Sequence, residues 1–247
     1  MALLLDDCNT HVSHRTQHFQ TFCDKLLTRV PHLHLWAASC FHGDAPTCWQ
    51  VKYLTRPLRS PPAVIREVKK NGKLTVRHVQ PYSERGVPDH TDGPPVRRLY
   101  HRGLSHAGHR SVDCVTCGLD VVSFLRSLRV GVTENVTTST TFISTSNGTA
   151  TPCLQWRDVL VLYWDDVSDD SGVVKGLKEA GIPVRVMTDD DIEDVATARS
   201  DVVWVARGHR VCGLERKVVV CVVDVNDIYD RLHFMSRCTS QLMIISR

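Results

Sequence analysis

The chain has 247 residues, of which 42% are hydrophobic and 23% are charged, and its formal net charge is +3. This length allows one large or two modest domains with a hydrophobic core, and the composition is typical of a soluble globular protein. No apolar run approaches the ~20 residues that cross a bilayer, and the first residues lack the basic segment of a secretory signal, so we expect neither a membrane protein nor a secreted one. Ten cysteines without the spacing of a small disulfide scaffold predict reduced thiols in the cytoplasm or nucleus.

The charged residues are unevenly distributed along the chain. Residues 51–110 hold 13 Lys/Arg against 4 Asp/Glu, whereas residues 161–230 hold 8 against 15. A basic segment can neutralise phosphates and so favour nucleic acid as a partner, although charge counts alone fit an ordinary solvated surface at least as well. Few aromatic residues interleave with the basic ones, so stacking of single-stranded bases is not indicated there.

Residues 1–55 are predicted to form a strand, a helix and a second strand. The apolar run Leu3–Leu5 is the first strand. Apolar residues between Phe19 and Leu27 then recur at helical spacing, and Pro31 ends that helix. The apolar run at residues 33–38 is the second buried strand.

The next predicted elements lie between residues 61 and 152. A helix opens at Pro61-Pro62, because proline is tolerated in a first turn, and it ends before Asn71-Gly72. A strand at residues 96–101 and a helix at residues 118–128 follow. Residues 132–152 are rich in Thr, Ser, Asn and Gly, and we expect them to form a flexible loop.

Residues 158–245 alternate between apolar strands and helices. Val159–Trp164 is a nearly continuous apolar run, as expected when both faces of a strand are covered. Strands that alternate with helices predict an α/β fold with a mostly parallel sheet. The predicted strands begin near residues 159, 181, 202, 217 and 242, with a helix through Leu177 and another starting at residues 226–231.

Two short motifs precede the last two predicted strands. Residues 209–215 resemble the H-x-x-K-G-L-E motif of superfamily 1 helicases of the UvrD/Rep type, and Ser236-Arg237 resembles their S-R-A-x-x-x-L motif. In that family the glutamate holds the nucleotide ribose and the arginine reaches the γ-phosphate. The resemblance therefore implies nucleotide binding by His209, Gly213 and Glu215, and a catalytic charge on Arg237. The alternatives are an ordinary turn glutamate and an arginine at a helix C-terminus.

A third match lies before the helix that opens at Pro61. Residues 53–61 resemble the family's L-x-x-N-Y-R-S-P motif, which implies that Arg59 contacts the γ-phosphate. A guanidinium suits this role because its charge is permanent and its planar fork matches phosphate oxygens. An exposed arginine beside a helix start is the alternative. Residues 158–163 and 181–184 resemble the family's D-I-A-V-L-Y strand and G-I-P-V turn, which mark the fold rather than the chemistry.

The first predicted strand ends in two carboxylates, as the Mg²⁺-binding strand of a P-loop ATPase does. This end resembles the family's Asp-Glu-x-Gln box, with Asp6 as the Mg²⁺ ligand and Asp7 in the place of the base. Five positions depart from the family: Asp7 replaces glutamate, Thr47 replaces a glutamine and Cys212 replaces a lysine, while Pro57 replaces the asparagine and Leu58 the aromatic residue of the R-S-P motif. No phosphate loop of the form G-x-x-x-x-G-K-[S/T] occurs in the chain.

The resemblance implies a RecA-like, P-loop NTPase architecture in two parts. Residues 1–52 would be the end of a first lobe, and residues 53–247 a second, UvrD-like C-terminal lobe. It further implies part of a nucleic-acid-dependent motor with Mg-ATP between its lobes, whose partners are DNA or RNA and a missing N-terminal lobe or another protein. We expect negligible ATP turnover by this chain alone. The alternative is a non-catalytic pseudo-ATPase that binds nucleic acid or protein in a regulatory role.

A group of histidines and cysteines lies at residues 101–117. Cys114 and Cys117 form a zinc-compatible pair, and two of the nearby histidines could complete four ligands, with His106 and His109 as the first candidates and His101 as the third. The alternative is a cysteine pair at a helix start beside a histidine-rich surface loop. A zinc-stabilised binding domain is therefore a further hypothesis for the whole chain.

Overall fold

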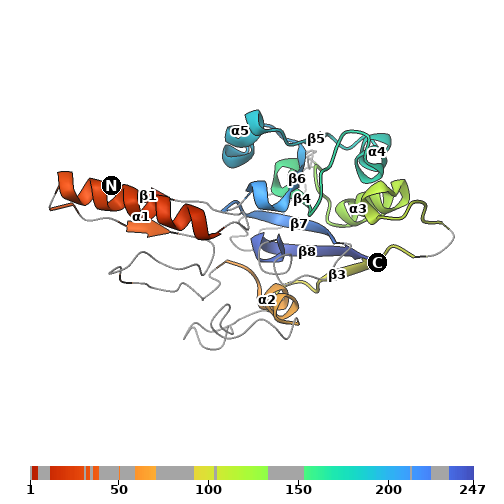
Figure 1. Ribbon diagram of the computed structural model, residues 1–247. Coiled ribbons are helices and arrows are strands. Elements are labelled where there is room, and N and C mark those ends of the chain that lie inside the picture. Colours follow the sequence, from red (N-terminus) through yellow and green to blue (C-terminus); the bar gives the residue numbers. More distant parts are fainter. Residues whose placement is uncertain are drawn as a thin grey trace, which may run out of the picture.

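The protein is an α/β structure built on a six-stranded, entirely parallel sheet with helices on both faces, as the computed structural model shows (Figure 1). This confirms the predicted fold class. The strand order is β3-β8-β7-β4-β6-β5. The strands are β3 (Arg97–Tyr100), β4 (Val159–Tyr163), β5 (Val184–Val186), β6 (Val203–Arg207), β7 (Arg216–Val223) and β8 (Cys238–Ser246). The structure describes residues 2–4, 12–30, 32–33, 36–38, 50, 59–70, 92–102, 105–132, 153–211, 213–223 and 234–247.

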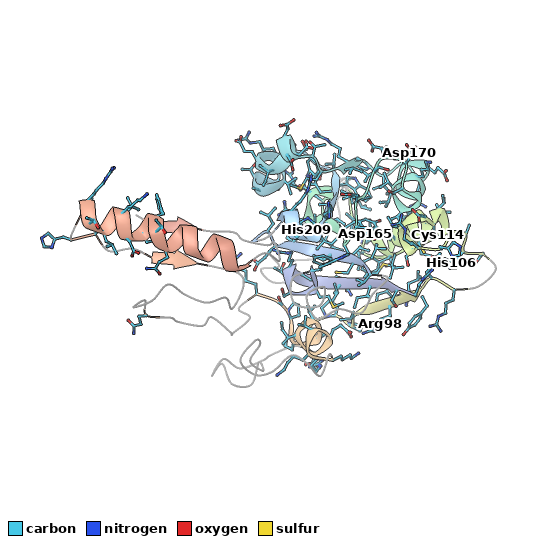
Figure 2. The ribbon with its side chains drawn as sticks, in the orientation of Figure 1. Arg98, His106, Cys114, Asp165, Asp170 and His209 are labelled. Atoms are coloured by element: carbon cyan, nitrogen blue, oxygen red, sulfur yellow. The ribbon has the colours of Figure 1, made fainter. Side chains whose placement is uncertain are left out.

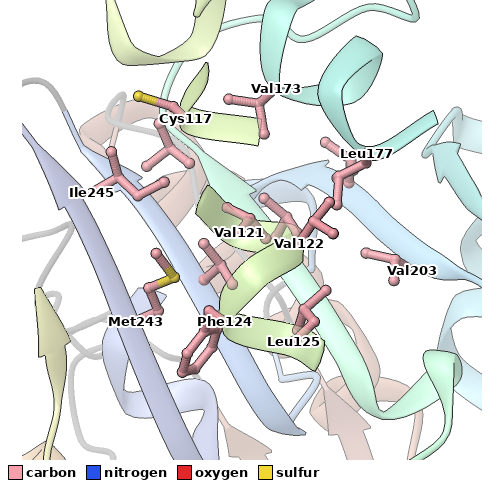
Figure 3. Packing of buried hydrophobic residues seen from close by; sticks show 14 of the residues in the cluster. Cys117, Val121, Val122, Phe124, Leu125, Val173, Leu177, Val203, Met243 and Ile245 are labelled. Atoms are coloured by element: carbon pink, nitrogen blue, oxygen red, sulfur yellow. The ribbon is translucent and has the colours of Figure 1, made fainter. Parts of the chain in front are cut away.

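The central strands are buried on both faces, which is why they read as continuous apolar runs. Alternate side chains of β4, β6, β7 and β8 belong to two separate clusters, one on each face of the sheet. The first cluster includes α3 (Val115–Ser127) and α4 (Gly172–Glu179), and Figure 3 shows α3 residues packed over the strands. The second includes α2 (Pro62–Lys69) and α5 (Ile192–Thr197). Both layers hold the sheet by burying aliphatic surface.

Helices α3 and α4 approach each other unusually closely, and glycines make this possible. A Cβ at Gly118 would lie 2.6 Å from the carbonyl oxygen of Val173, and one at Gly176 would lie 2.6 Å from that of Val115. At Gly172, at the start of α4, a Cβ would lie 2.2 Å from the carbonyl oxygen of Asp113. Any larger residue at these positions would push the two helices apart, because the obstructing atoms are backbone.

Helix α2 is tied to the edge strand β3 by a buried acid. The side chain of Glu67 is only 2% exposed, and its carboxylate pairs with Lys70 Nζ at 2.8 Å and with the guanidinium of Arg98. Gln241 of β8 donates to the carbonyl oxygen of Pro95 at 2.8 Å, just before β3 begins. These contacts fix the amino end of β3 and the orientation of α2.

The N-terminal part contains the predicted strand, helix and strand. β1 (Ala2–Leu4) pairs in parallel with β2 (Trp36–Ala38), and α1 (Val12–Arg29) connects them. None of the helices in the described ranges is long and apolar enough to span a bilayer. The predicted boundary between residues 52 and 53, the stop at Asn71-Gly72, the helix start at 226–231 and residues 133–152 of the predicted loop lie outside the described residues.

Two differences from the predicted elements have local causes. Helix α3 begins three residues earlier than the apolar pattern indicated, because the Cys114 side chain accepts the Cys117 N–H and caps the helix. Helix α5 was not predicted, since it is six residues long, acidic and buries only Val195. A capping box between Thr188 and Asp191 starts that segment instead of an apolar repeat.

Candidate functional site

Three segments that are distant in the sequence meet at the amino ends of β7 and β8. Arg59 Nη1 lies 2.7 Å from Glu215 Oε2, although 156 residues separate them. The hydroxyl of Ser60 donates to the carbonyl oxygen of Ser236 at 2.7 Å, and Arg237 Nη1 donates to that of Leu214 at 3.3 Å. The segments that resemble the R-S-P, G-L-E and S-R motifs are thus hydrogen-bonded to one another.

The packing of α2 explains why these segments converge. Val64, Ile65 and Val68 of α2 share the second hydrophobic cluster with Phe234 and Met235. Burying this apolar face holds α2 against the short 3₁₀ helix Met235–Arg237, which precedes β8. Residues 59 and 60, directly before α2, are thereby brought to the entrance of β7.

A groove of about 500 Å³, lined mostly by charged residues, opens at the amino ends of these strands. Four of its residues are basic and two are acidic, so the groove carries an excess of positive charge. Such a groove favours an anionic ligand that also offers hydroxyl groups. Its lining residues are Arg59, Arg157, Asp158, Ala198, Glu215, Arg216, Lys217 and Thr239.

The basic residues of the groove differ in how firmly they are held. Lys217 Nζ lies 3.1 Å from Asp158 Oδ1, whereas Arg216 donates to the carbonyl oxygens of Glu215, at 2.8 Å, and of Val195. Burial lowers the pKa of the Arg216 guanidinium, with a smaller opposing effect of Asp158. Arg216 is therefore fixed to the backbone, while Arg59 is an exposed and movable cation.

Arg59, Glu215 and Arg237 have very different exposures. The side chain of Arg59 is 74% exposed and that of Glu215 is 34% exposed. Arg237 is only 7% exposed and does not line the groove described by these residues. Its bond to Leu214, the neighbour of Glu215, places it behind the wall of the groove rather than in it.

Gly213 and His209 precede β7. Gly213 has a φ of +81°, and a Cβ there would meet nothing within 4 Å, so its glycine serves the turn and not a close approach. His209 belongs to the 3₁₀ helix Gly208–Val211 after β6 and is labelled in Figure 2. Burial lowers the pKa of His209, and the charges of Arg207 and Arg210 lower it further. This lowering, which the charge of Asp166 partly opposes, favours the neutral form of His209. His209 is not one of the groove-lining residues.

The remaining residues of the motifs cannot be placed against the groove. Asp6, Asp7, Thr47 and Cys212 lie outside the described residues. The groove itself supplies cations and hydrogen-bond acceptors. Binding of Mg-ATP and the identity of the magnesium ligands stay predictions from the sequence.

Apart from Arg59 and Glu215, the six groove-lining residues were not predicted as site residues. Five of these six lie at or next to the amino ends of β4, β7 and β8: Arg157, Asp158, Arg216, Lys217 and Thr239. The amino ends of neighbouring parallel strands lie at the same end of a sheet, so polar residues at these positions would be expected to meet. Identifying them required the order of the strands in the sheet, which the sequence does not give.

The histidine and cysteine side chains gather at the opposite edge of the sheet. His101, His106, Cys114 and Cys117 each offer one ligand atom, and these atoms all lie within 4.8 Å of one another. His109 lies outside this group, and its backbone carbonyl accepts a hydrogen bond from Arg247. The structure therefore assembles a set that contains His101 in the place expected for His109.

No family model matches the chain, and no curated protein matches it. Among solved structures, the chain is similar to the C-terminal domain of a possible DNA helicase from Lactobacillus plantarum WCFS1, with 13% sequence identity and a TM-score of 0.42. This match covers 76% of the chain and 86% of the other protein's chain.

Proposed function

We propose that this chain is the second RecA-like lobe of a superfamily 1 helicase-type ATPase, and that its groove holds the nucleotide. The convergence of the three motif segments is the observation that carries the proposal. A parallel α/β sheet flanked by helices is compatible with such a lobe. The motifs resemble that family in sequence order, and the hydrogen bonds between Arg59 and Glu215 and between Ser60 and Ser236 join them in space.

Arg59 and Glu215 have the chemistry that a nucleotide needs. The guanidinium of Arg59 would pair with phosphate oxygens, and the carboxylate of Glu215 would accept hydrogen bonds from the ribose hydroxyls. In the absence of nucleotide these two groups pair with each other at 2.7 Å. An ion pair this exposed contributes about 0–1 kcal/mol, so a ligand that offers each group a better partner can open it.

Arg237 has a different role in this proposal. Its guanidinium is buried and bonded to the carbonyl oxygen of Leu214. It would therefore position Glu215 and add positive potential behind the groove, rather than pair directly with the ligand in this conformation. Access to a phosphate would require the segments around it to move when the two lobes close.

The complete reaction needs groups that a first lobe would contribute. When bound, Mg²⁺ would neutralise charge on the transferred phosphoryl group and orient it for attack by water. Asp6 and Asp7 are the acids proposed for that side of the site. A first lobe or a second protein would supply the phosphate loop, and single-stranded nucleic acid would be the track in the cytoplasm or nucleus.

Binding of a fluorescent ATP analogue to the full chain tests the proposal. We expect measurable binding by the native sequence, and an affinity about tenfold lower for Arg59→Ala and for Glu215→Gln, since each removes about one charge-assisted hydrogen bond. Arg199→Ala is a matched control, because the exposed Arg199 forms an equally short ion pair with Glu193 at 2.7 Å. Equal effects of the three substitutions, or no binding at all, would refute the groove as a nucleotide site.

Steady-state phosphate release separates the motor from its non-catalytic alternative. We expect negligible turnover by this chain alone with single-stranded nucleic acid present. Robust turnover that Arg237→Ala abolishes would contradict the proposal that another lobe is needed. The departures at Asp7, Thr47 and Cys212 favour a pseudo-ATPase, which would bind nucleotide but would not turn it over even when a first lobe of this family is supplied in trans.

A further inference from the structure

Four potential metal ligands are brought together where β3 ends and α3 begins. His101 directly follows β3, and its backbone N–H donates to the carbonyl oxygen of Ser246 at 2.7 Å, which extends the pairing with β8. Cys114 caps α3 and Cys117 lies in its first turn. His106 comes from the loop between them. Figure 2 shows His106 and Cys114 adjacent at this end of the sheet.

The distances between these side chains fit a tetrahedral metal centre. His106 Nδ1 lies 3.4 Å from Cys117 Sγ and 3.6 Å from Cys114 Sγ, and His101 Nδ1 lies 3.3 Å from Cys117 Sγ. With zinc–sulfur bonds of about 2.3 Å and zinc–nitrogen bonds of about 2.0–2.1 Å, a tetrahedron has nitrogen–sulfur edges of about 3.6 Å. These three nitrogen–sulfur separations therefore differ from those of a zinc centre by a few tenths of an ångström, and all four ligand atoms lie within 4.8 Å of one another.

The outer nitrogens of both histidines have partners that leave the inner nitrogens available. His101 Nε2 lies 3.1 Å from the carbonyl oxygen of Gly108, which can only accept, so Nε2 carries the proton and Nδ1 is a lone-pair donor. His106 Nε2 lies 4.0 Å from the carboxylate of Asp120, which is within ion-pair range but too far for a direct hydrogen bond. Metal-bound histidines commonly have a carbonyl or carboxylate partner of this kind on the other nitrogen.

Burial and the state of the thiols also favour a metal. Cys114 and Cys117 are fully buried, and His101 is only 9% exposed. Neither cysteine forms a disulfide, and the N–H of Cys117 points at Cys114 Sγ at 3.5 Å.

We propose that His101 and His106, through Nδ1, and Cys114 and Cys117, through Sγ, bind one structural Zn²⁺. Two thiolates and two imidazoles suit zinc, and four protein ligands leave no position open for catalysis. The ion would join the edge strand β3, the following loop and α3 into one unit. This unit lies at the carboxyl end of β3, whereas the groove lies at the amino ends of the strands. The proposal is independent of the proposed nucleotide function, so either can fail alone.

Metal content of the purified full chain tests the site. Zinc-supplemented expression, gel filtration and elemental analysis should yield one zinc per native chain, and zinc at background level for the double variant Cys114→Ser/Cys117→Ser. The control is His109→Ala/Cys153→Ser, which removes one histidine and one cysteine outside the cluster. It should retain one zinc per chain. A native chain without zinc, or equal losses from both double variants, would overturn the proposal.

Two further measurements keep the test decisive if the cysteine variant fails to fold. Cobalt titration of the metal-stripped native chain should produce the visible bands of tetrahedral Co²⁺ and a thiolate charge-transfer band, and their absence would refute this ligand set. Asp120→Asn should keep the stoichiometry but lower zinc affinity about tenfold in competition with a chelator. Thiols and imidazoles that merely hydrogen-bond to one another would give neither result.

Discussion

The two edges of the parallel sheet carry polar clusters of opposite character. At the amino ends of the strands, Arg59 is exposed and Glu215 is half-buried, and each pairs with the other. At the carboxyl edge, Cys114 and Cys117 are fully buried, and His101 nearly so, with their ligand atoms turned toward one point. A buried polar cluster must be satisfied within the protein, whereas an exposed one can exchange its partners for a ligand. The buried cluster at the carboxyl ends of the strands suits a permanent structural ion. The exposed cluster at their amino ends suits reversible binding.

Loss of the proposed zinc should have the largest effect in the molecule. Removing the ion leaves the two buried thiols, the nearly buried His101 and the partly buried His106 without their common partner, and frees the loop that joins β3 to α3. Because losses of this kind exceed about 4 kcal/mol, and about 1 kcal/mol shifts the melting temperature by about 2–4 °C at this size, we expect a fall of at least about 10 °C. Differential scanning calorimetry with and without a strong chelator measures it, and an unchanged melting temperature would contradict a structural ion.

Substitution of Gly172 should weaken the same edge through the backbone. A Cβ at this position would lie 2.2 Å from the carbonyl oxygen of Asp113 and 2.6 Å from the nitrogen of Cys114. We expect Gly172→Ala to lower the free energy of unfolding by about 3 kcal/mol and to reduce zinc affinity, because α4 must move against a ligand-bearing segment. Urea unfolding and chelator competition measure both effects.

Gly181→Ala is the control for Gly172→Ala. Gly181 has a φ of +76°, but a Cβ there would meet nothing within 4 Å. We expect a loss of about 1 kcal/mol from backbone strain alone, with zinc affinity unchanged. Similar changes in zinc affinity for both variants would mean that Gly172 does not act through Cys114.

Arg237→Gln should lower nucleotide affinity at the amino ends of the strands more than it lowers the stability of the fold. The substitution removes the buried charge and the donor to the carbonyl oxygen of Leu214, so Glu215 is held less firmly. We expect nucleotide affinity to fall about tenfold, which is about 1.4 kcal/mol, while zinc content stays at one per chain. Titration with the fluorescent analogue and elemental analysis measure the two quantities. A loss of zinc in this variant would show that the two edges are not independent.

The turn before α5 contains a third polar cluster, for which no ligand is proposed. A substitution in this cluster should have the smallest effect of those described. Hydrogen bonds from the side chain and backbone of Thr188 lower the pKa of Asp191 below its ordinary value of 3.8. Stability from a carboxylate with a lowered pKa is present above the unfolded value and is lost as pH falls through the folded value. We expect Asp191→Asn to cost about 1 kcal/mol near pH 7, as for a helix cap, and the difference from the native chain to shrink below about pH 4. Urea unfolding at both pH values measures it, and a difference that grows on acidification would contradict the assignment.

The sequence predicted the sheet well because its strands are buried on both faces. The strands Val159–Tyr163 and Arg216–Val223 are buried on both faces, so neither shows the polar face of an amphipathic helix. Their apolar runs were therefore sufficient to predict strands. Helix α5 escaped prediction because a capping box, rather than an apolar repeat, starts that segment. Local pattern therefore identified those elements whose stability comes from burial.

The two clusters show what spacing cannot supply. The motifs identified Arg59 and Glu215 as candidates, but only the packing of α2 against the segment before β8 brings them within 2.7 Å. Spacing likewise left three histidines as candidate ligands for Cys114 and Cys117. His101 joins the cluster because β3 pairs with β8 and directs its next residue toward α3, which is a long-range consequence of strand order.

Hydrogen–deuterium exchange of the full chain with and without saturating Mg-ATP tests the central claim most directly. We predict slower exchange in residues 59–60, 213–217 and 235–239 when nucleotide is bound, with no change in α4 or around Cys114 and Cys117. Protection confined to other parts of the chain, or none in these three segments at full occupancy, would contradict a nucleotide site at the amino edge of the sheet.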